Sequence, residues 1–435
     1  MTAANEMSSG AALLERRFEV LGPRSPLFYD DPLQVVRGEG VWLYDAAGRR
    51  YLDAYNNVPH VGHCHPRVVD AICRQARTLN THTRYLDETV VAYAERLLGL
   101  FAAPLNRVFF TCTGSEANEL ALRIARECTG HQGVITTAHA YHGNTAAVAA
   151  ISSAFTRPEK RGQLTRTIPV IDPYRERGSR TDEELTAAYL EEARRAIDDL
   201  EARGVRLAAI LLCSAFSSEG LPAVPADYLS GMAELAHAAG GLFIADEVQA
   251  GFGRFGTDMW GYASQRTQPD IVTLGKPMGN GHPLSAVVTT AQLMDQFTNA
   301  TLYFNTFAGN QVSCAAGMAV LDILRDEGLL DNARVVGSHL VDRLRLLQHS
   351  YPNIGDVRGN GLFIGVDIVA DAGSSRAPAP AVARQIVNGM RAQGVLVSRT
   401  GPADNVLKIR PPMPFSTANA DQLVQTLGDV LTSSR

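Results

Sequence analysis

The sequence predicts an α/β protein with a large, mainly parallel sheet and a smaller α+β part. Continuous apolar segments of strand length, such as 207–213 and 241–246, alternate with stretches of helical periodicity. Hydrophobic residues make up 46% of the 435 residues and charged residues 20%, which favours a large buried core. No repeat and no low-complexity tract interrupts this pattern. We therefore expect one large sheet covered by helices on both faces.

The first expected elements form a small antiparallel meander at 36–57, where apolar and polar residues alternate around Gly and Asp-Ala-Ala-Gly turns. Helices at 67–79 and 88–100 follow by periodicity, and then a strand at 107–110. The next helix, 116–128, has small and apolar residues at three- and four-residue intervals, and Gly130 is a stop signal.

The remaining strands of the large sheet are short and apolar. They are expected at 133–136, 207–213, 241–246, 270–274 and 285–289. A long helical connection at 318–350, either continuous or broken, leads to a second αβ region at 361–368, 382–393 and 406–409, with a surface loop at 371–380. This organisation predicts a large domain at 66–325 and a small domain at 326–435, which the N-terminal segment 1–65 joins.

Charge and cysteine usage restrict the partners that we expect. Lys and Arg number 40 against 45 Asp and Glu, so the net charge of −5 offers no basic surface for nucleic acid and no cationic run for a membrane. The longest apolar runs are far shorter than a membrane span. Six scattered cysteines without a CxxC pair, and no readable secretory signal, indicate reduced, mostly buried thiols in a cytoplasmic protein.

Four segments at strand ends carry candidate chemistry. Gly114 and Ser115 open a helix, where free N–H groups can bind a phosphate, although ordinary helix capping gives the same pattern. Tyr141 precedes His142 and Gly143 after another strand, so its ring could stack on a planar cofactor or simply pack in the core.

The other two segments hold an acid and an amine. Asp246 ends an apolar strand, at the sheet edge where α/β proteins bind ligands, but it could equally be a loop carboxylate. Lys276 leaves a buried strand between Gly275 and Pro277, where burial would lower the pKa of the amine and make it a nucleophile and base. Most lysines are nevertheless solvated surface charges. Together the four segments describe a site for pyridoxal phosphate, which needs a Schiff-base lysine, an acid, a stacking ring and a phosphate cradle.

The motifs TCTGSEANELALRIAR, AYHGN, FIADEVQAGFGRFG, DIVTLGKPMGNGHP and FNTFAGN resemble the class III aminotransferases, which are fold-type I pyridoxal-phosphate enzymes. The likeness runs over about 32–432. It implies that Lys276 would form the Schiff base, that Asp246 would pair with the pyridine nitrogen, and that Gln249 would bond the ring hydroxyl.

The same resemblance implies the rest of the cofactor site. Tyr141 would stack on the ring, with His142 beside it as a further cofactor-binding residue. Gly114 and Ser115 would hold the phosphate, helped by Thr306 reaching across from a second subunit. The family likeness therefore implies a homodimer whose active sites are shared across the interface.

Two other motifs have less favoured functional interpretations. Residues 251–256 match GxGxxG after a strand, but no well-formed amphipathic helix and no suitably placed acid follow, which argues against dinucleotide binding. His60, His63 and His65 lack the spacing of a metal site, so turn and core roles are favoured and no metal is expected.

The residues expected around the substrate depart from the carboxylate-binding members of the family. Lys408 occupies the position before the Pro-Pro pair where those members carry an arginine that binds carboxylate, and Cys213 stands where they carry a glutamate. Lysine is a point charge that also binds phosphate. Arg410 lies two residues on, on the same face of the strand, and could substitute for the missing arginine.

The segments YNNVPHVGHCHP, YFNTFAGNQVSCA and NVLKIRPPM resemble the branch of ethanolamine-phosphate phospho-lyase. This likeness implies a lyase that converts O-phosphoethanolamine, or a related phosphorylated amino alcohol, to an aldehyde, ammonia and phosphate. Lys408 is expected to bind the substrate phosphate, with Asn56, Asn57 and Arg410 nearby; turn and strand roles are the alternative for the asparagines. The second interpretation is an aminotransferase that passes an amino group from an ω-amine or amino acid to pyruvate or glyoxylate.

Overall fold

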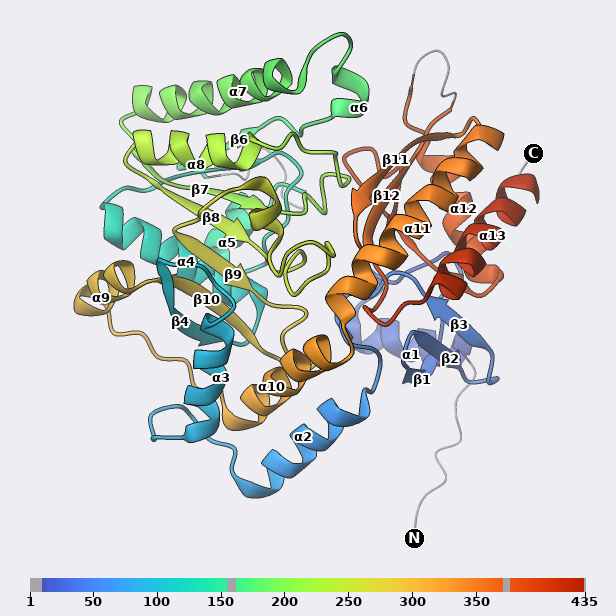
Figure 1. Ribbon diagram of the computed structural model, residues 1–435, viewed down its shortest axis with the longest axis horizontal. Helices are drawn as coiled ribbons and strands as arrows, with labels where there is room; N and C mark the ends of the chain where they lie inside the picture. The colour runs from blue at the N-terminus through green and yellow to red at the C-terminus, as the bar shows by residue number, and fades with distance from the viewer. Residues whose placement is uncertain (1–9, 155–161, 371–375, 434–435) are drawn as a thin grey trace.

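The computed structural model describes residues 10–154, 162–370 and 376–433 (Figure 1). Within these ranges seven strands form one sheet in the order β4-β10-β9-β8-β7-β5-β6. Strand β10 runs antiparallel to both of its neighbours, whereas the other pairings are parallel, so the sheet is mainly parallel as expected. The strands are β4 (Leu105–Thr111), β5 (Gly133–Thr137), β6 (Thr165–Ile168), β7 (Leu207–Cys213), β8 (Leu242–Asp246), β9 (Ile271–Leu274) and β10 (Ser285–Thr290).

Both faces of this sheet are buried, and strand β7 shows how. Ile210 and Leu212 belong to the large hydrophobic cluster under α7 (Asp182–Ala202) and α8 (Tyr228–Ala238). Ala209 and Leu211 belong to a second cluster under α4 (Gly114–Thr129), because successive strand side chains point to opposite faces. A strand buried on both faces must be apolar throughout, which explains the uninterrupted sequence of β7.

The second region is built from both ends of the chain. The meander β1 (Val35–Glu39), β2 (Trp42–Asp45) and β3 (Arg50–Asp53) gains a parallel strand, β13 (Val395–Leu396), against β3. Beside it lies an antiparallel sheet in the order β11-β12-β15-β14, from β11 (Ile354–Asn360), β12 (Phe363–Ile368), β15 (Val406–Ile409) and β14 (Ser398–Thr400). Figure 1 shows the blue N-terminal strands next to the red C-terminal elements. The boundaries near 65 and 325 stay predictions.

The predicted long helical connection is two helices, which break at Gly328 in the left-handed conformation (φ 60°). The first begins earlier than expected, at Gln311. These two helices are α10 (Gln311–Asp326) and α11 (Leu329–Ser350). The other helices are α1 (Gly10–Leu21), α2 (Pro66–Thr78), α3 (Glu88–Leu98), α5 (Ala146–Ile151), α6 (Pro173–Glu176), the 3-10 helix η2 (Gly261–Gln265), α9 (Ala291–Ala300), α12 (Pro380–Ala392) and α13 (Thr417–Ser433).

Two sequence predictions need correction. The helix predicted from Glu116 begins at Gly114, because the side chain of Thr113, and not Ser115, caps it by accepting a hydrogen bond from Glu116 N. The thiols are not mostly buried: only Cys213 and Cys314 are, while Cys64 and Cys73 are exposed, and all six cysteines are free. Part of the loop predicted at 371–380 lies outside the described residues.

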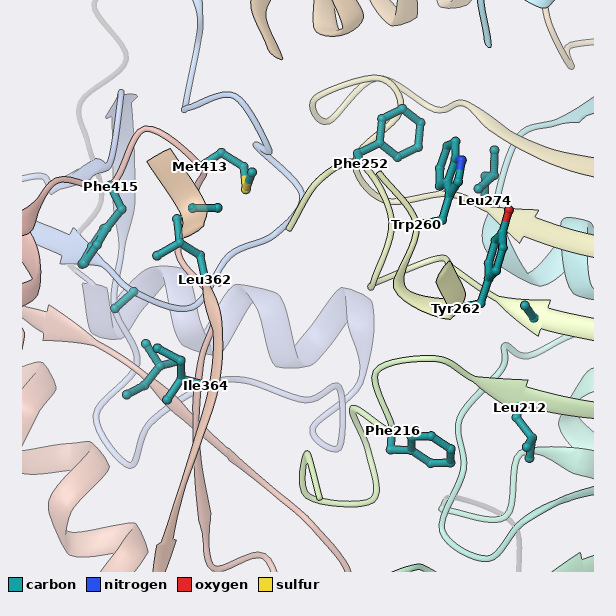
Figure 2. Packing of buried hydrophobic residues seen from close by; sticks show 14 of the residues in the cluster. Leu212, Phe216, Phe252, Trp260, Tyr262, Leu274, Leu362, Ile364, Met413 and Phe415 are labelled. Carbon is teal, nitrogen blue, oxygen red and sulfur yellow. The ribbon is translucent and has the colours of Figure 1, made fainter. Parts of the chain in front are cut away.

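One apolar core joins the two regions. Figure 2 shows Leu212 and Leu274 of the large sheet continuing through Phe252 and Trp260 toward Leu362 of the second region, all within a single cluster. Side chains that interlock across the junction fix the two regions relative to each other, so groups from both can form one rigid site. None of the described helices is long and apolar enough to cross a membrane.

Candidate active site

A cavity opens where the strands β4, β5, β7, β8 and β9 end, at the edge where ligands bind in α/β sheets. It is lined by residues from four of the predicted segments and by one further strand end: Gly114, Ser115, Tyr141, His142, Gly143, Cys213, Asp246, Val248, Gln249 and Lys276. All the cofactor residues predicted from the sequence are therefore brought together, with the exception of Thr306. Thr306 lies exposed in the segment between α9 and α10.

Lys276 follows β9 and projects its amine into a largely dehydrated setting. Burial and, to a smaller extent, the positive charge of Arg410 lower the pKa of this amine to about 8, against the opposite effect of Asp246. A lysine with this pKa is partly unprotonated near neutral pH, so it can act as a nucleophile and as a proton acceptor.

Asp246 is held by three N–H groups. His142 Nδ1 lies 2.7 Å from Asp246 Oδ2, and Asn118 Nδ2 donates to the same oxygen at 3.0 Å. The backbone N–H of Val248 donates to Oδ1 at 3.0 Å. His142 Nε2 lies 3.0 Å from Thr136 Oγ1, which fixes the ring from its other side. The carboxylate is thus locked in one orientation at the cavity wall.

Asn118 is a site residue that the sequence reasoning missed. Besides Asp246, its Nδ2 donates to His142 O at 2.8 Å, and its Oδ1 accepts from Thr273 Oγ1 at 2.7 Å. It lies in the first turns of α4 and is only 1% exposed. The available signal was a polar amide on a helical face whose next positions, Ala121 and Leu122, are apolar and buried.

Two glycines shape the cavity beside the start of α4. A Cβ on Gly114 would lie 2.8 Å from Val248 Cγ1, and a Cβ on Gly143 would lie 2.4 Å from Ser115 Oγ. Gly143 also has a φ of 138°, which other residues rarely adopt. Side chains are excluded here, so the first N–H groups of α4 stay accessible to an anion.

Two cationic side chains approach the site from the second region: Lys408 lies in β15, and Arg410 directly follows this strand. Lys408 is buried; its Nζ donates to Ser217 O at 3.0 Å and lies 5.9 Å from the centre of the Phe363 ring. Arg410 is also buried and donates to Tyr55 O at 3.0 Å and to Gln249 Oε1. Burial lowers the pKa of both groups, that of Lys408 well below its usual range.

The two predicted asparagines behave differently. Asn56 Nδ2 donates to Asp53 Oδ2 at 3.0 Å, and the side chain lines a separate apolar pocket with Phe28 and Tyr55. Asn57 is only 1% exposed, and neither of its side-chain polar atoms has a hydrogen-bond partner among the described residues. Asn57 therefore has hydrogen-bonding capacity that the folded chain leaves unused.

The three histidines near residue 60 and the glycine-rich segment 251–256 make hydrogen bonds and contacts within the folded chain. His60 Nε2 lies 2.8 Å from Phe252 O, and His63 Nε2 lies 2.7 Å from Asp53 Oδ2. His65 caps α2 and contacts Glu327. The segment 251–256 forms turns, and its Arg254 donates to two carbonyls at one end of the small antiparallel sheet, that of Leu362 just before β12 and that of Pro411 just after β15.

Comparison with known proteins agrees with this geometry. Residues 28–431 match the aminotransferase class-III family. The chain belongs to this family. It is 41% identical to a Drosophila melanogaster alanine–glyoxylate aminotransferase 2-like protein, over 99% of this chain and 89% of that one. It is 37% identical to ethanolamine-phosphate phospho-lyase homolog 1 of Caenorhabditis elegans, over 99% and 95% of the two chains.

A solved structure is similar to nearly the whole chain. An Arthrobacter phospholyase in complex with phosphoethanolamine superposes with a TM-score of 0.94 at 49% identity, covering 97% of this chain and 99% of that chain. A class III enzyme of this kind depends on pyridoxal phosphate. The site fits that cofactor, because the glycines leave a cradle beside the α4 N-terminus, and an amine and an oriented carboxylate line the same cavity.

Proposed function

We propose that this class III enzyme is a phospho-lyase acting on O-phosphoethanolamine or a related phosphorylated amino alcohol. With O-phosphoethanolamine, one water is consumed and acetaldehyde, ammonia and inorganic phosphate are formed. No amino acceptor enters this reaction.

The observation that carries the proposal is the pair of buried cations next to Lys276. Lys408 and Arg410 are both 6% exposed, yet their hydrogen bonds in the described part of the chain go to uncharged acceptors, namely two backbone carbonyls and the amide of Gln249. A buried cation is costly unless an anion accompanies it. A phosphate group on the substrate would supply that anion, and the unpartnered amide of Asn57 could donate to it.

Similarity to other proteins supports the same reaction. The Arthrobacter structure at 49% identity is a phospholyase in complex with phosphoethanolamine, and the nematode relative carries the name of an ethanolamine-phosphate phospho-lyase homolog. At these identities and coverages, a shared substrate class is the simplest inference.

In the proposed reaction pyridoxal phosphate supplies an electron sink for the carbon that bears the amine. Lys276 binds the cofactor and then removes the proton from that carbon. The bond between the neighbouring carbon and the phosphate oxygen breaks, and its electron pair leaves with phosphate. Lys408 and Arg410 hold the phosphate so that this bond is correctly oriented.

The remaining predicted residues keep their roles as part of the proposal. Asp246 pairs with the pyridine nitrogen, and Tyr141 stacks on the ring beside His142. Gly114 and Ser115 hold the cofactor phosphate. Gln249, whose Oε1 accepts from Arg410, is also proposed to bond the ring hydroxyl through its amide N–H groups. Asn56 is proposed to act indirectly, because its side chain is engaged with Asp53.

We also propose a cytoplasmic homodimer in which Thr306 completes the partner's site. Exposed apolar side chains surround this residue: Leu302, Phe304 and Phe307 on its own segment, and Leu86 on the facing loop, where His82 contacts Phe304. Exposed apolar clusters of this kind are typical of subunit interfaces. Sedimentation analysis showing a stable monomer would contradict this.

A second candidate is an aminotransferase using pyruvate or glyoxylate as acceptor, favoured by the relative at 41% identity that is named for alanine–glyoxylate transfer. One experiment separates the two. Purified enzyme loaded with pyridoxal phosphate is incubated with O-phosphoethanolamine and no keto acid, and phosphate and acetaldehyde are followed over many turnovers. We expect sustained release of both in equal amounts. Turnover of amines only after a keto acid is added would establish the aminotransferase instead.

A further inference from the structure

Cys213 occupies a position on the cavity wall that the proposed reaction does not use. It ends β7, directly opposite Asp246 in the register with β8, and lines the same cavity as Lys276. The side chain is 5% exposed. Burial raises the pKa of its thiol to about 12, so the group is uncharged at neutral pH.

The thiol lies beside the proposed phosphate-binding cation. Cys213 Sγ is 3.9 Å from Ser217 Oγ, and Lys408 Nζ donates to the carbonyl of the same serine at 3.0 Å. Cys213 also packs in the apolar cluster of Phe363, over whose ring Lys408 Nζ lies. Two separate contacts therefore bring residue 213 next to Lys408.

The acids around the site are already engaged elsewhere. Asp246 accepts from His142 and Asn118, and Asp53 accepts from Asn56 and contacts His63. Glu219 is buried, which raises the pKa of its carboxyl group, and it accepts hydrogen bonds from Thr137 Oγ1 and Ser218 N. No carboxylate in the described ranges hydrogen-bonds Lys408 or Arg410; Glu219 acts on Lys408, and Asp53 on Arg410, only through space, where each raises the pKa of the cation.

Position 213 is thus a place on the cavity wall where a fixed acid would neutralise Lys408, and the chain has an uncharged thiol there. A carboxylate at this position would also attract Arg410 and Lys276, because negative charge at residue 213 raises the pKa of both groups.

We propose that Cys213 is a specificity-determining residue, whose neutral side chain leaves Lys408 and Arg410 without a hydrogen-bonded counter-ion in the described part of the chain and so reserves both cations for a doubly charged phosphate group. This inference rests on the proposed phospho-lyase function and names the feature that selects its substrate class. A carboxylate on the substrate brings one negative charge to two cations, whereas a phosphate brings nearly two. An acid at position 213 would compete with either for the same cations.

The test compares Cys213→Asp with Cys213→Asn, since these side chains have nearly the same shape and differ in charge. Inorganic phosphate binding to each pyridoxal-phosphate-loaded protein is measured by calorimetry, and KM for O-phosphoethanolamine by phosphate release. We expect Cys213→Asp to weaken both at least about 10-fold more than Cys213→Asn, as one buried charge a few ångströms away would. Cys213→Glu with Cys213→Gln repeats the comparison with a longer side chain, in case the Asp variant does not fold.

The outcomes separate this inference from the proposed function. Equal weakening in the acid and amide variants would mean that shape, not charge, matters at position 213 and would overturn the inference. Unchanged phosphate binding in the acid variants would do the same, and in both cases a wild-type enzyme that releases phosphate leaves the lyase intact. A wild-type enzyme that neither binds inorganic phosphate nor releases it from O-phosphoethanolamine overturns the proposed function and this inference together.

Discussion

Two asparagines, each 1% exposed, show how differently the two sides of the active site are built. Asn118, on the cofactor side, donates to Asp246 and to the His142 carbonyl and accepts from Thr273. Asn57, on the side that we propose to bind the substrate, has no partner for its amide among the described residues. Buried polar groups are normally hydrogen-bonded, so an unsatisfied one calls for an explanation.

The same contrast holds for the charged groups. On the cofactor side Asp246 is held by a histidine, an amide and a backbone N–H. On the substrate side Lys408 and Arg410 bond only uncharged acceptors within the described ranges. The first side is therefore complete as a folded structure, whereas the second has unused capacity for an anion.

Lys276→Arg should abolish turnover, with a loss of at least about 10³-fold, because guanidinium stays protonated and cannot form the Schiff base. The charge at the site is kept, so the effect reports the nucleophile alone. Phosphate release and the visible absorbance of the cofactor are measured together. A variant that still holds a borohydride-reducible chromophore would show that another amine binds the cofactor.

Lys408→Met should raise KM for O-phosphoethanolamine by about 10²-fold, the cost of removing one partner from a buried charged pair. Binding of ethanolamine should change much less, because this amine has no phosphate group for Lys408 to bind. Titration of the cofactor spectrum with each amine measures both affinities. Equal losses for the two amines would remove Lys408 from phosphate binding.

Leucine replacements at the two asparagines keep the branched shape and remove the polar atoms. Asn118→Leu should lower the free energy of unfolding by about 1–3 kcal/mol, because it leaves buried partners unsatisfied. Asn57→Leu should be close to neutral for stability while weakening phosphate binding. Thermal unfolding measures the stability of both variants, and calorimetry with inorganic phosphate measures their affinity for the anion. Similar destabilisation by the two substitutions would contradict the difference that we infer between the two sides.

The pH dependence of cofactor uptake should show how the two sides interact. Schiff-base formation needs unprotonated Lys276, whose pKa is about 8, so the uptake rate of cofactor-free protein should rise with pH and level off above about 8. Arg410→Gln removes a positive charge that lowers this pKa, so the levelling should move to higher pH. N-acetyl-lysine in the same solutions is the control, since an ordinary lysine amine titrates near about 10.4. A levelling point that stays in place would show that Arg410 does not act on Lys276.

Much of the cofactor side could be predicted because its residues sit at strand ends. Asp246 and Lys276 each follow an apolar strand, and the ends of neighbouring parallel strands meet at one edge of the sheet. The position of a residue at the end of an apolar strand was therefore enough to predict that it lies near the other strand ends. The reversed direction of β10 could not be predicted, since its apolar sequence reads the same either way.

The missed residues depend on contacts between distant segments. Asn118 is a site residue only because Thr273 and the His142 carbonyl come to it from other strand ends. Arg254 is buried without a carboxylate and instead joins the carbonyls of Leu362 and Pro411, more than a hundred positions along the chain. Nothing in the sequence around either residue specifies those partners.

The parallel pairing of β3 with β13, in which Leu52 lies opposite Val395, has a consequence for synthesis of the protein. The ribosome releases the meander first and its neighbouring strand almost last, so the early segment waits through nearly the whole of translation before its sheet is complete. Lys276 and Asp246 emerge well before Lys408 and Arg410. The nascent chain can therefore assemble the side that lines the Lys276 cavity while the side that we propose to bind the substrate is still incomplete.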